Sequence, residues 1–232
     1  CTLKLMSNDE MRQSEGAFHK KVADVKWVAS RLSYDSSSSE VIFGIGELVA
    51  GALRHRIIPA QGIADDDELW CLASQLTSGV AGIHGKGVIH LSIEVRAKQR
   101  PQLVLTASTH TQPQNVYLTA MGDVRIASFH RARDAGAADI PFSHPEDKVE
   151  YRAPEDEPLN FASDMFSVGV TLFEMATGKL PDTASLDRDQ LLATIDDPAK
   201  HELLSFTRHA VPSKRPTAEA LLQHITSLAP SS

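Results

Sequence analysis

The fold is decided by Tyr151-Arg-Ala-Pro-Glu155 and by the stretch that follows it, Ser163-Asp-Met-Phe-Ser-Val-Gly-Val-Thr-Leu-Phe-Glu-Met-Ala-Thr-Gly178. Residues 165–175 are apolar nearly all round, which predicts a helix that is buried on every side. A third string, His209-Ala-Val-Pro-Ser-Lys-Arg-Pro-Thr217, ends in a residue that favours the N-cap of a helix. Apolar residues recur at helical spacing after it, so the sequence predicts a final helix there.

Taken in this order, the three strings resemble the large lobe of protein kinases, and together they cover much of the chain. The resemblance implies an α+β, two-lobed protein kinase-like fold with a truncated small N-terminal lobe, because no glycine-rich loop precedes Cys1. Residues 1–47 would be the remnant of the small lobe, with its third strand, its regulatory helix and a hinge strand. Residues 48–232 would form the large, mainly helical lobe.

Three residues match structural positions of that family. Asp164, in the predicted core helix, would anchor the catalytic loop through hydrogen bonds. Arg215 would meet Glu155, and an Arg fork that binds a carboxylate in a bidentate manner makes a geometrically specific pair. These roles follow from the resemblance and are structural whatever the chemistry of the protein.

Periodicity supports the arrangement of elements outside these strings. Residues 14–32 have apolar positions at helical spacing, and residues 41–45 form a short apolar run typical of a strand. A helix is predicted to begin at Asp65, where consecutive carboxylates suit the positive end of the helix dipole. Residues 116–118 and 124–126 read as a hairpin with Gly122 at the turn.

The charged positions expected of a kinase are mostly altered. Lys4 resembles the strand lysine that contacts the phosphates of the nucleotide, as a vestigial phosphate contact or as a surface lysine. The family's spacing in the regulatory helix places Lys21 where a glutamate should pair with it, and two ammonium groups would repel each other. The string Ser128-Phe-His130 stands where the family has Asp-Phe-Gly, so a hydroxyl replaces the carboxylate that holds magnesium.

The catalytic loop is also altered. The approach His84-Gly-Lys-Gly-Val-Ile-His90 resembles the family, but Asn115 follows Ser92 by 23 positions where the family has five, which indicates an insertion of 18 residues at about 93–111. Depending on where this insertion begins, Ser92 or His110 occupies the position of the catalytic base. Neither residue is an aspartate.

These losses predict that the chain is a pseudokinase and not an enzyme, because phosphoryl transfer depends on the base, the metal carboxylate and the lysine partner. No resident cofactor is expected, neither ATP nor Mg²⁺. Asn115 would be a vestige of the metal site, since an amide and a hydroxyl are poor ligands for Mg²⁺. The resemblance then implies a protein-binding scaffold or an allosteric regulator of a partner such as an active kinase. The alternatives are a metal-independent nucleotide sensor and an atypical active Ser/Thr kinase.

Composition agrees with an ordinary soluble globular protein. The net charge of −7 argues against nucleic acid as the main partner, and no run of eighteen apolar residues is present to span a membrane. The expected partners are therefore proteins, in the cytoplasm or as a secreted effector, with the compartment unknown. The inserted segment from Glu94 to Thr111 is the candidate contact surface, and a solvated loop without a role is the alternative.

Overall fold

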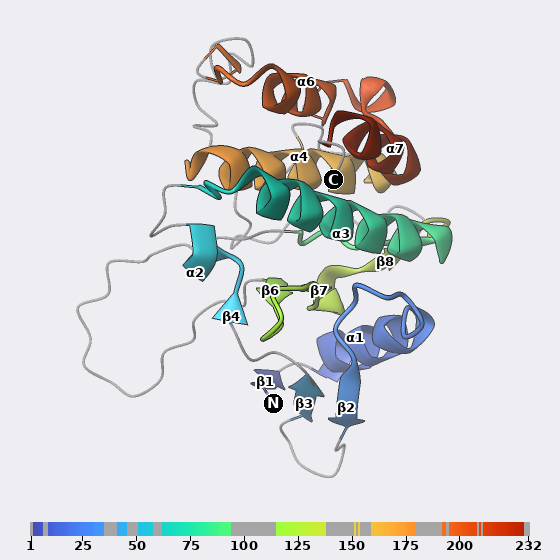
Figure 1. Ribbon diagram of the computed structural model, residues 1–232. Coiled ribbons are helices and arrows are strands. Elements are labelled where there is room, and N and C mark those ends of the chain that lie inside the picture. Colours follow the sequence, from blue (N-terminus) through green and yellow to red (C-terminus); the bar gives the residue numbers. More distant parts are fainter. Residues whose placement is uncertain are drawn as a thin grey trace, which may run out of the picture.

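The computed structural model describes residues 2–6, 9–34, 41–45, 51–57, 62–93, 115–137, 151, 153, 159–179, 192–193, 195–207, 209 and 211–229. Within them the chain has a mixed architecture of helices and small sheets. Figure 1 shows the N-terminal strands and the first helix on one side of the short central strands, with most of the helices on the other side.

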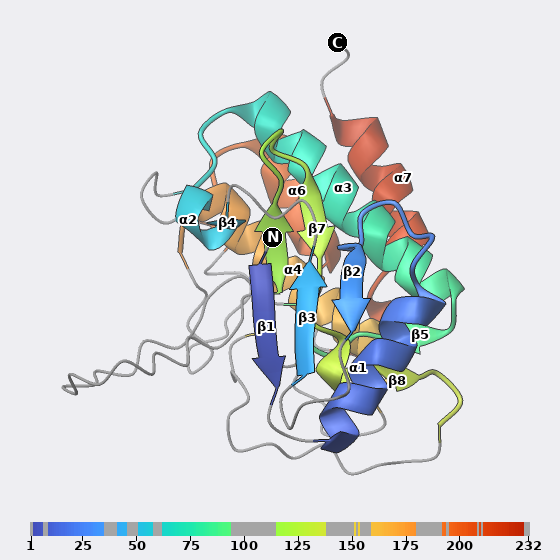
Figure 2. The ribbon, with the colours of Figure 1, turned by 90° about the horizontal axis from the view of Figure 1, so that it is seen from below.

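The N-terminal part is a three-stranded antiparallel sheet with one long helix. The strands lie in the order β1 (Thr2–Met6), β3 (Val41–Ile45) and β2 (Arg31–Tyr34), as Figure 2 shows. Helix α1 (Asp9–Lys21) connects β1 to the rest of this part and contacts β1. The helix therefore ends eleven residues earlier than the predicted helix over residues 14–32, and part of the remaining sequence forms β2.

The helical part is built on α3 (Asp66–Gly85) and α4 (Phe161–Thr177), which contact each other. Helix α7 (Ala218–Leu228) packs against α3, and α6 (Pro198–Thr207) packs against α4 and α7. Short α2 (Arg54–Ile57) follows the two-residue strand β4 (Gly51–Ala52), and the 3-10 helix η2 (Pro212–Lys214) precedes α7. As predicted, the helix α4 is buried along nearly its whole length and Thr217 is the N-cap of α7.

The capping residues explain where the long helices begin and end. The Asp65 side chain accepts a hydrogen bond from the Glu68 backbone N–H at 2.8 Å, which satisfies one of the free donors at the start of α3. Asn160 and Ser163 form a reciprocal capping box at the start of α4. The helix ends at Gly178, whose φ of 68° lies in the left-handed region that glycine adopts without strain.

Short strands join the two parts of the molecule. The hairpin of β6 (Val116–Leu118) and β7 (Val124–Ile126) has the predicted bounds and pairs with β4. Strand β5 (Val88–Ile89) follows α3 and pairs with β8 (Arg133–Asp134), and the 3-10 helix η1 (Phe129–Arg131) lies between β7 and β8. The bridge between Val28 and Ile126 ties the segment after α1 to the hairpin.

Several sequence-based predictions fall outside the described residues: His110, Glu155, the inserted segment 94–111 and the hinge residues 46–50. The backbone of Lys4 lies in β1 opposite Phe43, and only the backbone of this residue is described. In the part of the chain that is described, no helix combines the length and the apolar character needed to cross a bilayer.

Candidate functional site

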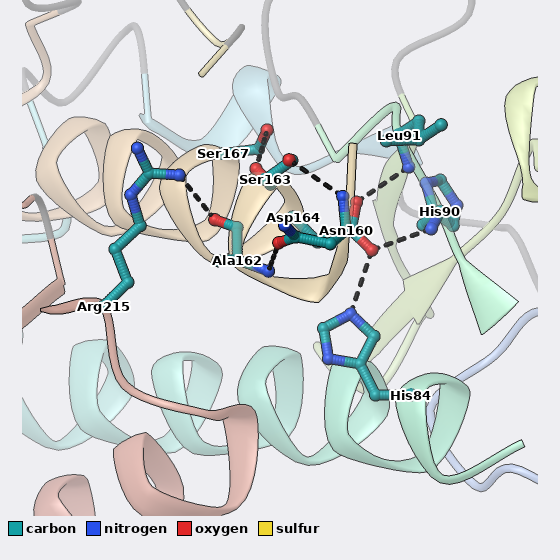
Figure 3. A network of polar contacts seen from close by, with 9 residues as sticks. All are labelled: His84, His90, Leu91, Asn160, Ala162, Ser163, Asp164, Ser167 and Arg215. Carbon is teal, nitrogen blue, oxygen red and sulfur yellow. Dashed lines mark hydrogen bonds and ion pairs between the residues drawn. The ribbon is translucent and has the colours of Figure 1, made fainter. Parts of the chain in front are cut away.

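A buried carboxylate organises the end of β5. Asp164 lies in the first turn of α4 and is fully buried. Its two oxygens accept hydrogen bonds from the backbone N–H groups of His90 and Leu91, both at 2.7 Å, and Oδ2 also lies 2.9 Å from Nε2 of His84. Figure 3 shows the three partners around this one side chain. Charge-assisted hydrogen bonds of this kind are short and strong, so Asp164 fixes the backbone just before Ser92.

Two of the described residues adopt a left-handed backbone conformation that is uncommon outside glycine, and one of them is bonded to this carboxylate. Leu91 has a φ of 57° and Ser128 has a φ of 71°. Such strained residues persist only where the surrounding structure holds them, and they cluster at functional sites. The hydrogen bond of the Leu91 N–H to Asp164 supplies that restraint for the first of them.

The residue Asn115 connects the two ends of the predicted insertion. Its Nδ2 donates to the backbone oxygen and to the Oγ of Ser92, both at 2.7 Å, and its own backbone oxygen accepts from the Ala127 N–H at 2.9 Å. Asn115 and Ser128 are each 1% exposed, and Ser92 is 8% exposed. Ser92 and Asn115 are therefore in contact although they are far apart in sequence, and Ala127, the residue before Ser128, is bonded to Asn115. Residues 92, 115 and 128 are called the junction below. Of the two candidates for the base position, Ser92 lies at this junction.

A stack of three aromatic rings links α1 to this junction. The ring of Phe129 contacts the ring of His90 at a centroid distance of 4.7 Å and that of His19 at 4.8 Å, both edge to face. Phe129 is fully buried, and both histidines are buried beside it. Because His19 belongs to α1 and His90 follows β5, Phe129 links the position of α1 to the segment that follows β5.

Helix α1 presents the carboxylate of Glu15 to the core. It is fully buried, and its Oε1 lies 3.6 Å from Nε2 of His19. Lys21 lies instead at the surface, where its ammonium pairs with Asp134 of β8. Glu15 lies six residues before Lys21 in the same helix, and the assignment of Lys21 to the position of the helix glutamate stays a prediction. Residues 15, 19 and 22 share one helix face, and all three are buried.

Burial also sets the protonation of His90. Desolvation lowers its pKa from 6.5 to about 4, and the nearby Asp164 charge opposes this only in part. The neutral ring keeps one nitrogen at hydrogen-bond distance from the Ala127 oxygen, 3.2 Å away. At neutral pH the ring stack is therefore uncharged at His90. The pKa of Tyr117 on β6 is raised, mainly by burial and secondarily by the charge of Glu15.

The polar residues at the junction do not suit the magnesium ions that the resemblance implies. Asn115 Oδ1 is buried and has no hydrogen-bond partner among the described residues, which fits one ligand to a cation. Among the described residues, the other two positions that the resemblance assigns to this place are Ser92 and Ser128. Neutral hydroxyls are weak ligands for Mg²⁺, which is usually held by one or two carboxylates. Within the described ranges there is also no group of three or more His, Cys, Asp and Glu side chains that could hold a metal.

The remaining predicted residues serve structural contacts. Arg215 is 7% exposed, and it donates from Nε to the His209 oxygen at 2.7 Å and from Nη1 to the Ala162 oxygen at 2.8 Å. Its guanidinium also lies 5.0 Å from the ring centre of Phe166. His130 belongs to η1 and is half-buried. Arg215 thus ties the segment before α7 to the start of α4, while its predicted partner Glu155 is outside the described residues.

Comparison with known proteins gives one consistent class of relative. The chain is 28% identical over 165 residues to the "Serine/threonine-protein kinase pkn3" of Myxococcus xanthus, a match that covers 66% of this chain and 28% of the relative. It is 26% identical over 193 residues to the "Mitogen-activated protein kinase kinase kinase YODA" of Arabidopsis thaliana, with 77% and 20% covered. It is 26% identical over 226 residues to the "Serine/threonine-protein kinase 17A" of Oryctolagus cuniculus, with 87% and 51% covered.

The chain is kinase-like. Its relatives are protein kinases at low identity, and it spans between a fifth and about half of the length of these three. No protein-family model matches the chain. The mixed architecture of helices and small sheets agrees with a truncated kinase-like fold.

The relatives correct one sequence-based prediction, namely that this chain is not an enzyme. Curated protein kinases from bacteria, plants and animals match it, so the comparison favours a kinase. The serines at positions 92 and 128 do not by themselves show that phosphoryl transfer is lost.

Sequence reasoning missed Glu15 and His19. A signal for them existed, because Glu15, His19 and Val22 recur at intervals of four and three residues and so define one face of a helix. This signal is weak, because a buried helix face is usually recognised by its apolar residues and two of these three residues are polar.

Proposed function

We propose that this kinase-like chain is a signalling domain that binds a protein partner, as a scaffold or as an allosteric regulator of, for example, an active kinase. The observation that carries the proposal is the hydrogen bonding of Asp164 to the backbone of His90 and Leu91. This internal framework is intact next to a junction at which Ser92 and Ser128 replace charged side chains expected from the resemblance. A role in binding requires the framework and does not depend on those charges.

The ring stack gives such a domain a means of transmitting a change. His19, Phe129 and His90 pack in a row, so a displacement of α1 has to be accommodated by the residues beside Asp164. Packed cores respond to such displacements by switching between discrete arrangements rather than by bending continuously. A partner that holds α1 in one position would therefore bias the conformation of the junction.

The inserted segment from Glu94 to Thr111 is the proposed contact surface for that partner. Its two flanks are held together at Ser92 and Asn115, so contacts made by the segment would lie next to the junction. Loop closure entropy changes slowly with length, so a short Gly-Ser bridge in place of these residues should leave the fold nearly as stable.

The test compares the full chain with this shortened chain as baits for partner capture. The proposal expects equal melting temperatures and a clear loss of partners from the shortened bait. A matched control exchanges the order of residues within the segment at constant composition, which separates sequence recognition from loop length. Equal recovery of the same partners by all three proteins would contradict the role of the segment.

Phosphoryl transfer is the second candidate function, favoured by the buried Glu15 of α1 and by the kinase relatives. In kinases a helix glutamate pairs with the strand lysine, and this pair must be in place for activity. Transfer of labelled phosphate from ATP, measured for the wild-type protein, Glu15→Gln and Lys4→Ala, tests it. Activity that follows protein dose and is lost in both variants supports a kinase, whereas signal that is equal in all three comes from a contaminant.

A further inference from the structure

A tryptophan between two cations marks the surface where the turn after α1, residues 22–27, meets the central hairpin. Trp27 is half-buried, and Nζ of Lys26 lies 4.3 Å from the centre of its ring. Cζ of Arg125 lies 5.8 Å from the same centre. The two cations come from distant parts of the chain, because Lys26 belongs to the turn and Arg125 to β7. Residues 26, 27 and 125 are called the tryptophan patch below.

The tryptophan patch has a fixed backbone geometry. The carbonyl of Trp27 accepts a hydrogen bond from the Ile126 N–H at 2.8 Å. Helix α3 has glycine where the turn approaches it: a Cβ added to Gly79 would lie 3.0 Å from Cβ of Trp27, and a Cβ added to Gly82 would lie 2.6 Å from Cγ1 of Val25. Figure 2 shows the turn after α1 beside α3. A surface that is already ordered loses little conformational entropy when a ligand binds to it.

The charge of the patch is opposite to that of the chain, whose net charge is −7. Both charged members of the patch are cations, and within the described residues no carboxylate pairs with Lys26. The ion pair of Asp24 with Lys86 nearby in the sequence is balanced. Screening confines surface charge interactions to about 8 Å at physiological ionic strength, so a short acidic ligand responds to the patch. A nucleic acid or an anionic membrane extends much farther and meets the negative charge of the whole protein.

We propose that the tryptophan patch binds an acidic peptide segment of a protein partner. The inference rests on the proposed function, because it names the chemistry of the partner that the signalling domain would bind. Carboxylates of the segment would pair with Lys26 and Arg125, and its apolar groups would cover the exposed part of the Trp27 ring. Tryptophan and arginine are enriched among the residues that dominate the binding energy of protein interfaces.

Binding at the patch would act on the connection between α1 and the hairpin. Ile126 donates to the Trp27 carbonyl and accepts from the Ala29 N–H at 2.9 Å. The next residue, Ala127, donates to the Asn115 carbonyl, also at 2.9 Å. Two backbone hydrogen bonds on adjacent residues of the hairpin thus link the patch to the junction. A partner that holds Trp27 would restrain the segment after α1 at the point where it meets the hairpin.

Fluorescence titration of the full chain with ten-residue peptides tests the inference. The probes alternate Ser with Glu, Gln or Lys. The chain has two tryptophans, and Trp27→Phe supplies the background signal of the buried Trp70. The Glu peptide should change the Trp27 emission in a saturable way, with an affinity several-fold lower at about 300 mM salt than at about 50 mM. No binding of the Glu peptide, or equal binding of the Gln peptide, would overturn the proposal.

Lys26→Glu is the decisive variant, and Lys214→Glu is its matched control. Both lysines are exposed and both substitutions change the charge equally, but Lys214 belongs to η2. Lys26→Glu should weaken binding of the Glu peptide about tenfold and Lys26→Gln about threefold, because a pairing charge is reversed or removed. Lys214→Glu should change the affinity by less than about twofold. Equal losses in Lys26→Glu and Lys214→Glu would show that the peptide responds only to net charge, which contradicts a site at the patch.

A ten-nucleotide single strand of DNA and vesicles that contain phosphatidylserine are the remaining probes. If either binds as tightly as the Glu peptide, the partner class is wrong and the proposal fails. Failure of this inference is distinguishable from failure of the proposed function. Capture of protein partners by a chain that does not bind the Glu peptide leaves the proposed function intact and removes only the patch. Binding of the Glu peptide by a chain that captures no protein partner supports the patch and removes the proposed function.

Discussion

The carboxylate of Asp164 accepts a hydrogen bond from the backbone N–H of His90 at 2.7 Å, across 74 residues of sequence. With the neighbouring bond to Leu91, it satisfies two backbone donors that burial would otherwise leave unpaired.

Replacing Asp164 by Ala should therefore destabilise the protein strongly. A buried and a partly buried N–H group lose their acceptor and His84 loses its partner, so the free energy of unfolding should fall by roughly 3 kcal/mol or more. Chemical denaturation measures the change. Asp24, an exposed carboxylate that pairs with Lys86, is the matched control, and Asp24→Ala should leave the denaturant midpoint almost unchanged. Equal losses in both variants would contradict the anchoring role of Asp164.

The lowered pKa of His90 predicts a dependence of stability on pH. The folded protein holds the ring neutral down to about pH 4, whereas the unfolded chain takes up a proton near 6.5. This contribution to stability is complete above pH 6.5 and is lost as the pH falls through 4, with a total of about 3 kcal/mol. The free energies of unfolding of the wild type and of His90→Phe should therefore approach each other as the pH falls over this range, because only the wild type loses this contribution. A constant difference between them would be evidence against a neutral, buried His90, and the exposed His201→Gln serves as the control.

Glu15 and Lys21 of α1 should respond very differently to truncation. Glu15 is fully buried, so Glu15→Ala removes contacts and leaves a cavity beside His19, and it should lower the denaturant midpoint clearly. Lys21 forms an exposed ion pair with Asp134, and such pairs contribute little in water, so Lys21→Ala should be almost neutral. The reverse order of effects would mean that Lys21 is the residue that couples α1 to the core.

Arg215 provides a test that depends on the shape of its side chain. Its two hydrogen bonds to backbone oxygens use the fork of the guanidinium, so Arg215→Ala should cost roughly 3 kcal/mol of stability. Arg215→Lys should recover only a small part, because an ammonium cannot reproduce both contacts. The exposed neighbour Lys214→Ala is the control and should have little effect. Full recovery by lysine would indicate that only the charge matters.

The helices and hairpins were largely predictable, because local patterns specify them. Residues 116–118 and 124–126 form the predicted strands, and Thr217 caps the predicted helix. The predicted helix over residues 14–32 was too long, since apolar residues at helical spacing continue past Lys21 through turns and a bridge to the start of β2. Periodicity alone does not reveal where such a helix ends.

The site was only partly predictable, because it depends on tertiary contacts. Asp164, Ser92 and Asn115 were recognised from their sequence neighbours, but the bond between the last two joins residues that an insertion separates. His19 packs against the ring of Phe129, which comes from a distant part of the chain. The role of these residues depends on three-dimensional packing, which cannot be inferred from the sequence of α1 alone.

The hydrogen bonds from Asn115 to Ser92 have a consequence for engineering. These bonds hold Ser92 and Asn115 against each other. The distance between the two residues is therefore fixed whatever sequence connects them. A folded domain whose own termini lie close together could be inserted there without forcing the rest of the protein apart. Inserting a circularly permuted fluorescent protein between positions 93 and 114 would thus place a reporter within one residue of the junction, and turn a change at that junction into an optical signal.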